Sequence, residues 1–331
     1  MVEPNGLGVK SGPHSGATGA MISLEHAKQA LLRSGYLLEN RVESLLVRRG
    51  YGVQANTPFL DTISEKEREL DLHALRLVSA GPAEFDFVWS VLLIECVNNP
   101  QPIAFVTKDS DLRETEIYRI KMAGVPTRII DPQKPGRWIL LADYLGMSRY
   151  HHYCKGRTAT QFCSFSQKKG SNDWMASHID EHWDDLGKVI RALEHFRSDL
   201  FDCWRPPSRK RQPDHINVEI YYPLVVLQGE LLDVQQSRTA LHIRPAKHMQ
   251  YTRSTLSAGR ESFYQIDVVT ERYLPRYLTI IEEELERTGR LLRRRQKHVR
   301  KSLNRLVTAA SRYRSPDRIR SALEPAAHFL E

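Results

Sequence analysis

The sequence predicts an α/β fold. The first observation is a pair of apolar strand-like segments, Glu69–Leu77 and Trp89–Val97, each interrupted by one carboxylate, Asp71 or Glu95. Apolar runs of this kind are typical of strands that are covered on both faces. The second observation is that helical patterns precede and follow these segments along the chain. Because an unpaired carboxylate is costly in such strands, each one indicates a nearby cation, a hydrogen-bond donor or an open cleft.

The N-terminal half contains most of the expected elements. Ser23 precedes an apolar pattern with helical spacing and is expected to cap that helix. The elements that follow are a helix at Tyr36–Arg49, strands at Gly52–Phe59, Glu69–Leu77 and Trp89–Val97, a helix at Asp111–Met122 and a strand at Pro126–Ile130.

A domain boundary is expected between residues 131 and 150, where prolines and glycines accumulate. Beyond it, Trp174–Phe201 has the spacing of a long amphipathic helix, and another helix begins at Leu274. Ile216–Leu227 and Phe263–Val269 have the β-branched and aromatic content of strands. The expected organisation is a flexible tail over residues 1–22, an α/β domain over 23–150 and a largely helical α+β domain over 151–331.

Composition limits the class of protein. With 331 residues and 27% charged residues, the chain can form a full core and has the balance of a globular protein. The net charge of +8 favours a polyanionic partner such as nucleic acid. No apolar run approaches the roughly 18 residues of a membrane helix, and the start lacks the pattern of a secretory signal. Four cysteines without a disulfide pattern fit a reducing compartment, so we expect a cytoplasmic protein without membrane contact.

Three acidic residues carry a family resemblance. Glu43 lies on the helix before the first strand, Asp71 follows a Glu-Leu pair, and Glu95 lies in the segment Ile-Glu-Cys-Val-Asn-Asn-Pro-Gln-Pro. Together with the αβββαβ order of elements, these residues resemble the PD-(D/E)XK, or restriction-endonuclease-like, nuclease superfamily. The resemblance covers residues 36 to 131. It implies a restriction-endonuclease-like core and metal-dependent hydrolysis of phosphodiester bonds.

The resemblance also implies the metal ligands. Asp71 and Glu95 would hold Mg²⁺ or Mn²⁺, and Glu43 would complete the coordination directly or through water. Carboxylate oxygens are the ligands that these hard cations prefer. We therefore expect Mg²⁺ or Mn²⁺ as the cofactor.

One position departs from the family pattern. Two residues after Glu95 the family carries a lysine, whereas this chain carries Val97. Valine has no charge or hydrogen-bond donor, so it cannot orient a nucleophile or stabilise negative charge on phosphorus. Three explanations stay open: a lysine from elsewhere, with Lys108 as the candidate catalytic residue; a metal ion that suffices without an amine; or a cleft that binds without cutting.

Basic residues are concentrated in the C-terminal helix. They follow a glutamate-rich stretch with no intervening acid, and such a stripe can neutralise several phosphates. A solvated helix face is the alternative, equally favoured by the sequence. The residues expected to bind nucleic acid, with DNA as the expected form, are Arg290, Arg293, Arg294, Arg295, Lys297, Arg300 and Lys301.

A zinc site is a weaker possibility at the domain boundary. His151, His152, Cys154 and Cys163 are all residue types that bind zinc, but their spacing lacks the paired cysteines of common structural sites. The sequence does not favour a metal there.

The leading functional hypothesis is a metal-dependent DNA endonuclease. One alternative is a nuclease-like protein that has lost catalysis and binds nucleic acid without cutting it. Another is a non-enzymatic assembly subunit, in which the long helices after Trp174 form a partner surface or a homo-oligomer.

Overall fold

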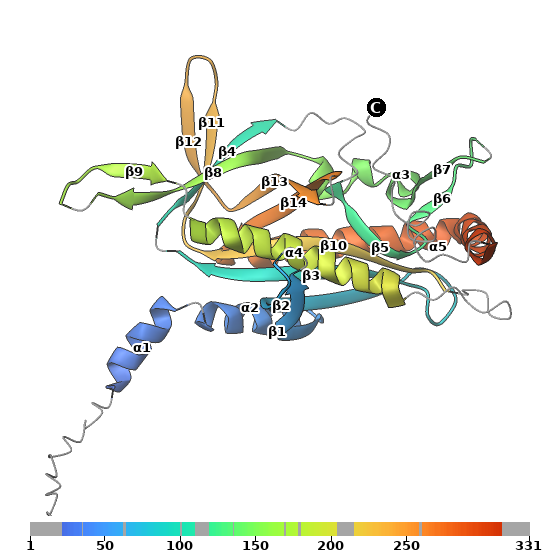
Figure 1. Cartoon of the computed structure of the whole chain (residues 1–331), viewed down its shortest axis with the longest axis horizontal. Coiled ribbons are helices and arrows are strands. Elements are labelled where there is room, and N and C mark those ends of the chain that lie inside the picture. Colours follow the sequence, from blue (N-terminus) through green and yellow to red (C-terminus); the bar gives the residue numbers. More distant parts are fainter. Residues whose placement is uncertain are drawn as a thin grey trace, which may run out of the picture.

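The protein is an α/β protein built on one large mixed sheet, with helices on both faces and a long helix at its C-terminal end (Figure 1). The sequence-predicted α/β class is confirmed. The computed structural model describes residues 22–34, 36–61, 64–99, 101–109, 119–134, 136–168, 170–177, 180–203, 215–257 and 260–312.

Twelve strands form the main sheet in the described part of the chain. The main path runs in the order β1-β2-β3-β10-β14-β13-β8-β4-β11-β12, while β5 pairs with β10 and β9 pairs with β8. The strands are β1 Gly52–Asp61, β2 Lys66–Ser79, β3 Phe87–Asn98, β4 Ile103–Asp109, β5 Lys121–Val125, β8 Arg157–Gln167, β9 Trp174–Ser177, β10 Asn217–Gln228, β11 Leu231–Gln236, β12 Leu241–Ala246, β13 His248–Ser257 and β14 Arg260–Thr270.

Five α-helices and a small second sheet complete the described residues. The two strands β6 and β7 pair only with each other. These elements are α1 Leu24–Arg33, α2 Tyr36–Arg48, β6 Arg128–Ile130, β7 Trp138–Leu140, α3 Leu141–Leu145, α4 Asp180–Cys203 and α5 Leu274–Arg312, with short 3₁₀ turns at Met147–Arg149, His152–Cys154 and Glu271–Tyr273.

The centre of the sheet joins the two halves of the chain. β3 is antiparallel to β2 but parallel to β10, and the β3–β10 register runs from Phe87↔Asn217 to Asn98↔Gln228. On its other edge, β10 is parallel to β14. The two domains expected on either side of residue 150 thus share one sheet.

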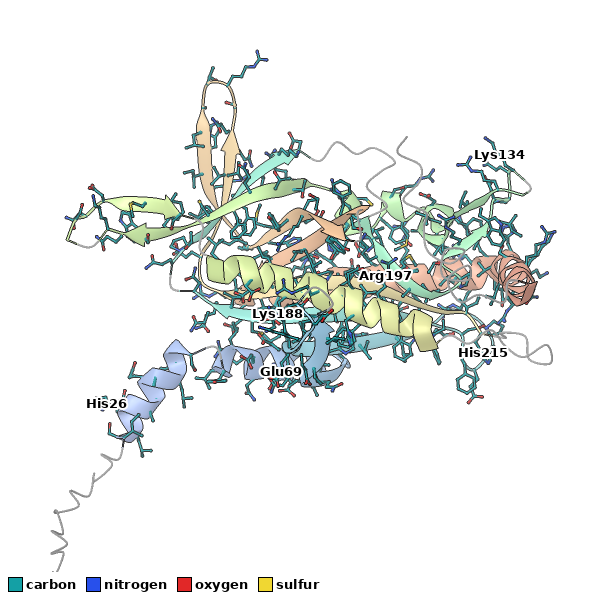
Figure 2. The ribbon with its side chains drawn as sticks, viewed as in Figure 1. His26, Glu69, Lys134, Lys188, Arg197 and His215 are labelled. Carbon is teal, nitrogen blue, oxygen red and sulfur yellow. The ribbon has the colours of Figure 1, made fainter. Side chains whose placement is uncertain are left out.

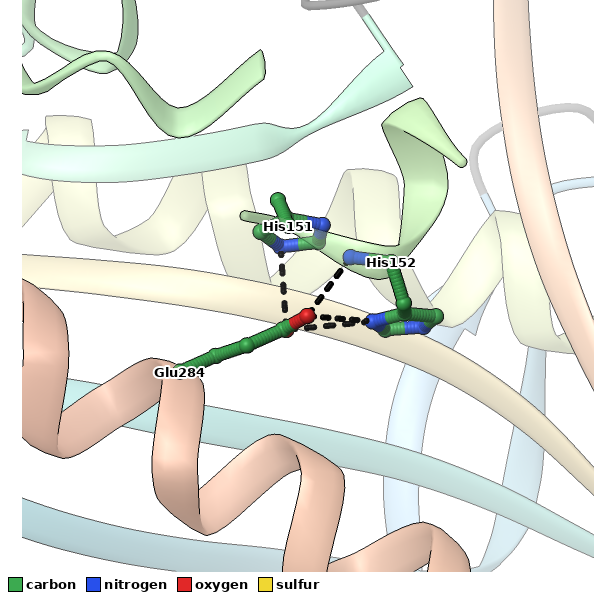
Figure 3. Close-up of side chains that lie close together, drawn as sticks. All are labelled: His151, His152 and Glu284. Atoms are coloured by element: carbon green, nitrogen blue, oxygen red, sulfur yellow. Dashed lines mark hydrogen bonds and ion pairs between the residues drawn. The ribbon is translucent and has the colours of Figure 1, made fainter. Parts of the chain in front are cut away.

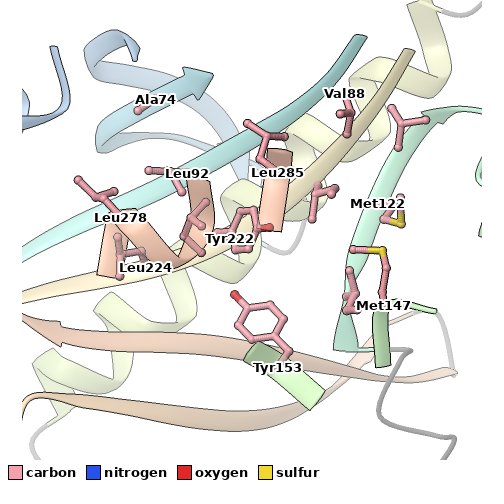
Figure 4. Close-up of a cluster of buried hydrophobic side chains, with 14 of the residues drawn as sticks. Ala74, Val88, Leu92, Met122, Met147, Tyr153, Tyr222, Leu224, Leu278 and Leu285 are labelled. Atoms are coloured by element: carbon pink, nitrogen blue, oxygen red, sulfur yellow. The ribbon is translucent and has the colours of Figure 1, made fainter. Parts of the chain in front are cut away.

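Helices cover the two faces of this central region. Alternate residues of β3 point to opposite sides, as the pleat requires. Leu93 packs in a core with Leu186 and Ile190 of α4. Leu92 packs on the other face with Leu278 and Leu285 of α5, a core shown in Figure 4. α2 joins this second core through its buried residues Leu38, Val42 and Leu46.

A glycine allows α5 to approach the sheet closely. A Cβ atom at Gly289 would lie 2.8 Å from Val78 Cγ2 and 3.0 Å from the Ser79 carbonyl oxygen. Gly289 also lies near Val88, at the beginning of β3. Because α5 begins beside Arg49 and passes Val88 later, its basic half lies at the end of β3 remote from Glu95.

Several local predictions are confirmed. α1 begins after Ser23, whose side-chain oxygen accepts a hydrogen bond from the His26 amide at 3.2 Å. α2 and the strands β1, β2, β3, β10 and β14 lie where the sequence placed them, within a few residues at each end. Among the described residues, no helix has the length and apolar character needed to cross a membrane.

Other local predictions are wrong. Lys121 and Met122, expected at the end of a helix, belong to strand β5, which pairs with β10; most of that expected helix lies outside the described residues. The strand expected at Pro126–Ile130 shortens to β6 and pairs with β7 instead of joining the main sheet. The helix expected from Trp174 begins at Asp180, because Trp174–Ser177 extend the edge of β8 as β9. The tail expected over residues 1–22 falls outside the described residues except for Ile22.

Candidate functional site

Asp71 and Glu95 meet where β2 and β3 separate. The pairing of the two strands ends at Leu72↔Ile94. One residue further, the Asp71 Oδ2 atom accepts a hydrogen bond from the Cys96 amide at 2.7 Å, and Glu95 Oε1 lies 3.4 Å from the Asp71 amide. Both carboxylates therefore occupy one small region at the end of the β2–β3 pair.

A lysine from α4 lies between these carboxylates. Lys188 Nζ is 2.6 Å from Glu95 Oε2 and 3.6 Å from Asp71 Oδ1. The neighbouring residues Val189 and Ile190 are buried against the sheet, which holds this turn of α4 over β3. Figure 2 shows Lys188 on α4 beside the central strands. The lysine is thus positioned by tertiary packing.

The region is buried on one side and open on the other. The Glu95 side chain is 4% exposed, whereas those of Asp71 and Lys188 are each 21% exposed. A small ligand or a phosphate group can therefore approach Asp71 and Lys188, while Glu95 forms the floor.

Burial and mutual repulsion shift the pKa values of these groups. Burial, with the nearby Asp71 charge, raises the pKa of Glu95 to about 8. Burial also raises the pKa of Asp71, against the opposing effects of the Cys96 amide and Lys188. For Lys188, burial alone would lower the pKa, but the carboxylates of Glu95, Asp71 and Asp185 together outweigh it and raise the pKa. Strong shifts in a partly open site are typical of functional groups.

Two more carboxylates surround the pair. Glu39 in the first turn of α2 has a pKa that is raised by burial and by the charge of Asp71. Asp185 on α4 acts electrostatically on Asp71, Glu95 and Lys188. With all groups ionised, four carboxylates and one ammonium give a formal charge of −3 (−4 + 1). This excess of hard oxygen donors could hold a divalent cation.

Ion pairs fix the next turn of α4. Arg191 Nε lies 3.1 Å from Asp61 Oδ2, and Arg68 Nε lies 2.9 Å from the same oxygen. Arg191 and Arg68 both reach Asp184 as well. Because Asp61 is on β1 and Arg68 is on β2, this network ties α4 to the strands that carry the site.

Comparisons with known proteins add no information about this site. The chain matches no protein-family model, no curated protein and no solved structure. The chemical interpretation therefore rests on the contacts described above.

The structure does not bring every predicted residue to this site. Lys108 is exposed on β4, and four strands separate β4 from β3 along the sheet. Glu43 lies one helical turn after Glu39, and it is Glu39 whose pKa responds to Asp71 and Lys188. The structure thus offers Lys188 in place of Lys108 and adds Glu39 to the charges near Asp71.

The basic residues of α5 divide into two groups. Arg290, Arg294, Lys297 and Lys301 are exposed and recur with a spacing that places them on one side of the helix. The other three contact the fold: Arg293 donates to the Ser79 carbonyl at 3.0 Å, Arg295 to the Tyr144 carbonyl, and Arg300 pairs with Asp86.

The exposed stripe is remote from the carboxylates. α5 packs on the face of the sheet opposite α4, and Gly289 lies beside Val88. Glu95 lies seven residue steps along β3 from Val88, a length of about 23 Å. The stripe therefore cannot contact the same phosphate group as Lys188.

Sequence reasoning missed Lys188 and Glu39. Lys188 is the single lysine of α4 and is next to buried apolar residues, which is a weak signal in a helix with many charged residues. Glu39 and Glu43 are one turn apart on α2, so the helical pattern alone cannot tell them apart.

A second titratable cluster is buried under α5. His152 Nδ1 lies 3.0 Å from Glu284 Oε2, and His152 Nε2 lies 3.0 Å from Asp267 Oδ2. Burial alone would lower the pKa of His152, but the charges of Glu284 and Asp267 outweigh it and raise the pKa to about 10. The protonated His152 ring therefore lies between two buried carboxylates and offsets part of their charge.

Proposed function

We propose that the chain is a metal-dependent phosphodiesterase of the PD-(D/E)XK type, with DNA as its expected substrate. The observation that carries this proposal is the convergence of Asp71, Glu95 and Lys188 within hydrogen-bonding or ion-pair distance. Two acids on adjacent strands with one amine are the groups that the family resemblance calls for. The amine comes from α4 and so compensates for Val97.

The order of elements supports the same proposal. Leaving out residues 99–179, the chain runs α2, β1, β2, β3, α4 and β10, with β10 parallel to β3. This is the αβββαβ order of the superfamily. On this interpretation the helix and the fourth strand of the core are α4 and β10, and the intervening residues are an insertion.

The residues fit a divalent cation. Asp71 and Glu95 offer carboxylate oxygens, and Glu39 and Asp185 add negative charge nearby. Oxygen donors suit Mg²⁺ or Mn²⁺ better than zinc or copper. When bound, such an ion makes a water more acidic and neutralises charge that develops on a phosphate.

Lys188 has a distinct part in this chemistry. Its ammonium group lies between the two carboxylates and is partly exposed, so it can donate a hydrogen bond to a phosphate oxygen or to the attacking water. Because the pKa of Lys188 is raised, the side chain stays protonated, so it stabilises negative charge on phosphorus and does not act as a base. Glu95 and Asp71 hold its Nζ atom in place.

Cleavage of DNA tests the proposal. Supercoiled plasmid would be incubated with the full chain in Mg²⁺ or Mn²⁺, alongside Asp71→Asn and Glu95→Gln. We expect the wild type to cut and each variant to lose roughly 10³-fold or more in rate, because each one removes a charged ligand of the cation. Glu84→Gln is the matched control, since Glu84 is a carboxylate in the turn between β2 and β3, away from the site.

A second readout separates metal binding from catalysis. Mn²⁺ should raise the thermal unfolding temperature of the wild type and of Glu84→Gln, but not that of Asp71→Asn. Equal cleavage by wild type and variants would indicate a contaminating nuclease and refute the catalytic assignment. Binding of DNA without any cleavage would favour the non-cutting alternative.

A further inference from the structure

The buried histidine cluster contains an unsatisfied polar atom. His151 is fully buried, yet its Nε2 atom lacks a hydrogen-bond partner among the described residues. It points at Glu284, whose Oε2 atom is 3.7 Å away (Figure 3). Leaving a buried ring nitrogen unpaired is costly, so this position calls for a partner.

Three possible donor atoms lie close together. His151 Nε2, His152 Nδ1 and a Glu284 carboxylate oxygen all lie within 4.8 Å of one another. Two ligands of a tetrahedral zinc ion, each about 2.0–2.1 Å from the metal, lie about 3.3 Å apart. The observed separations of 3.0 Å and 3.7 Å from Glu284 bracket that value.

The surrounding residues orient the donor atoms in the same way as residues around known metal sites orient the metal ligands. A histidine ligand commonly donates its other ring N–H to a carboxylate. His152 Nε2 meets Asp267 Oδ2 at 3.0 Å, which directs the Nδ1 lone pair toward Glu284 and His151. Asp267 is itself held by the Tyr277 hydroxyl at 2.6 Å and by His248 Nε2 at 2.6 Å.

We propose that His151, His152 and Glu284 form a buried site for Zn²⁺ that ties α5 to the turn before β8. Two imidazoles and one carboxylate are a donor set that zinc accepts. The site is closed to solvent, so its role is structural. It lies on the α5 face of the sheet and is separate from the Asp71–Glu95 pair.

The ion would replace the proton of His152 as the cation of the cluster. His151 must also change tautomer, because its Nδ1 accepts a 3.2 Å hydrogen bond from the Tyr153 amide, which leaves the proton on Nε2. Zinc binding therefore releases one proton, from His152, and gives up the hydrogen bond from the Tyr153 amide, so the affinity for zinc should rise with pH.

Metal content decides the proposal. The full chain would be purified, saturated with Zn²⁺, dialysed against metal-free buffer and analysed by inductively coupled plasma mass spectrometry. We expect about one tightly held zinc ion per chain. Glu284→Gln and His151→Phe should lose it, and Asp267→Asn should weaken Zn²⁺ binding roughly 10–100-fold. His242→Phe, at an exposed histidine of β12, and Asp71→Asn should both retain the metal.

A spectroscopic measurement on the wild type tests the site without relying on variants that fold poorly. Co²⁺ loaded in place of Zn²⁺ should give visible absorption in the wild type and in His242→Phe, and none in Glu284→Gln. Wild-type protein that folds but holds neither Zn²⁺ nor Co²⁺ after dialysis would overturn the proposal. Zinc that is retained equally by wild type and Glu284→Gln would overturn it as well.

Discussion

Two buried charged clusters lie on opposite faces of the same sheet and differ in how their charge is neutralised. On the α4 face, Asp71 and Glu95 repel each other and share one lysine, and part of the site is exposed. On the α5 face, His152 lies between Glu284 and Asp267, and all three side chains are nearly inaccessible to water.

This difference separates a partly exposed site with excess negative charge from a buried site in which a histidine cation lies between two carboxylates. The carboxylate pair holds excess negative charge next to solvent, an arrangement that costs stability unless a cation arrives. In the histidine cluster, the His152 cation offsets part of the charge of Glu284 and Asp267, so its ion pairs contribute to folding. Removing a carboxylate should therefore raise the stability of the metal-free protein on the α4 face and lower it on the α5 face.

The largest expected effect concerns Lys188. Lys188→Met should lower the rate of DNA cleavage roughly 10²–10⁴-fold, because it removes the ammonium beside the carboxylates. Lys108→Met is the matched comparison and should leave the rate unchanged, since Lys108 is exposed on β4. Single-turnover cleavage of a labelled duplex measures both rates.

A double variant sharpens this test. Val97 follows Glu95 by two residues and packs on the α4 side of the sheet, at the position where the superfamily that the sequence resembles carries a lysine. Val97→Lys should restore part of the activity that Lys188→Met removes. A slower rate in Lys108→Met than in Lys188→Met would show that the amine is supplied from β4 instead.

The next effect is on stability. Glu284→Ala should lower the free energy of unfolding by about 3–5 kcal/mol, because it leaves His152 and Asp267 with an incomplete buried charge network. Glu283→Ala, at the exposed neighbour on α5, should change it by less than about 0.5 kcal/mol. Urea unfolding in EDTA measures both, and similar values for the two variants would contradict the buried network.

The carboxylate pair should make the stability of the metal-free protein fall as pH rises. The pKa of Glu95 is about 8 in the folded chain against an ordinary value of 4.5, so the folded chain binds more protons than the unfolded chain between these values. Without metal, the contribution of Glu95 to stability is present at low pH and is lost as pH rises toward about 8, by a few kcal/mol.

Glu95→Gln isolates this dependence. The variant cannot ionise, so its advantage in free energy of unfolding over wild type should grow between about pH 6 and about pH 8.5. Urea unfolding in EDTA at the two pH values measures this difference. A constant difference would show that Glu95 is ionised throughout the range.

The smallest effect on cleavage is expected from the exposed stripe of α5. Replacing Arg290, Arg294, Lys297 and Lys301 by glutamine should weaken DNA binding and lower the slope of its salt dependence by about 0.9 for each phosphate that the protein no longer neutralises. The cleavage rate at saturating DNA should change little, because the stripe is remote from Lys188. Fluorescence anisotropy over a salt series provides the measurement, and unchanged binding would identify the stripe as a solvated face.

The sequence predicted the strands that carry the acids better than the groups that surround them. Asp71 and Glu95 interrupt apolar runs whose period and composition are local, so their positions on neighbouring strands could be inferred directly. Where the structure describes them, the helix and strand expected after the third strand were wrong: Lys121 and Met122 belong to β5, and Arg128–Ile130 pair with β7. The helix and strand that pack against β3 are α4 and β10, which follow residues 99–179, and no local pattern reveals so distant a pairing.

By itself the sequence determined the α/β class, the helix before the first strand and the two carboxylates, since each depends on residues within one or two turns or strands. Only the tertiary structure decided that Lys188 meets Glu95 across 93 positions and that Glu284 meets His152 across 132. The physical reason is that such contacts are set by strand order and by which helix covers which face, and both arise from packing the whole chain.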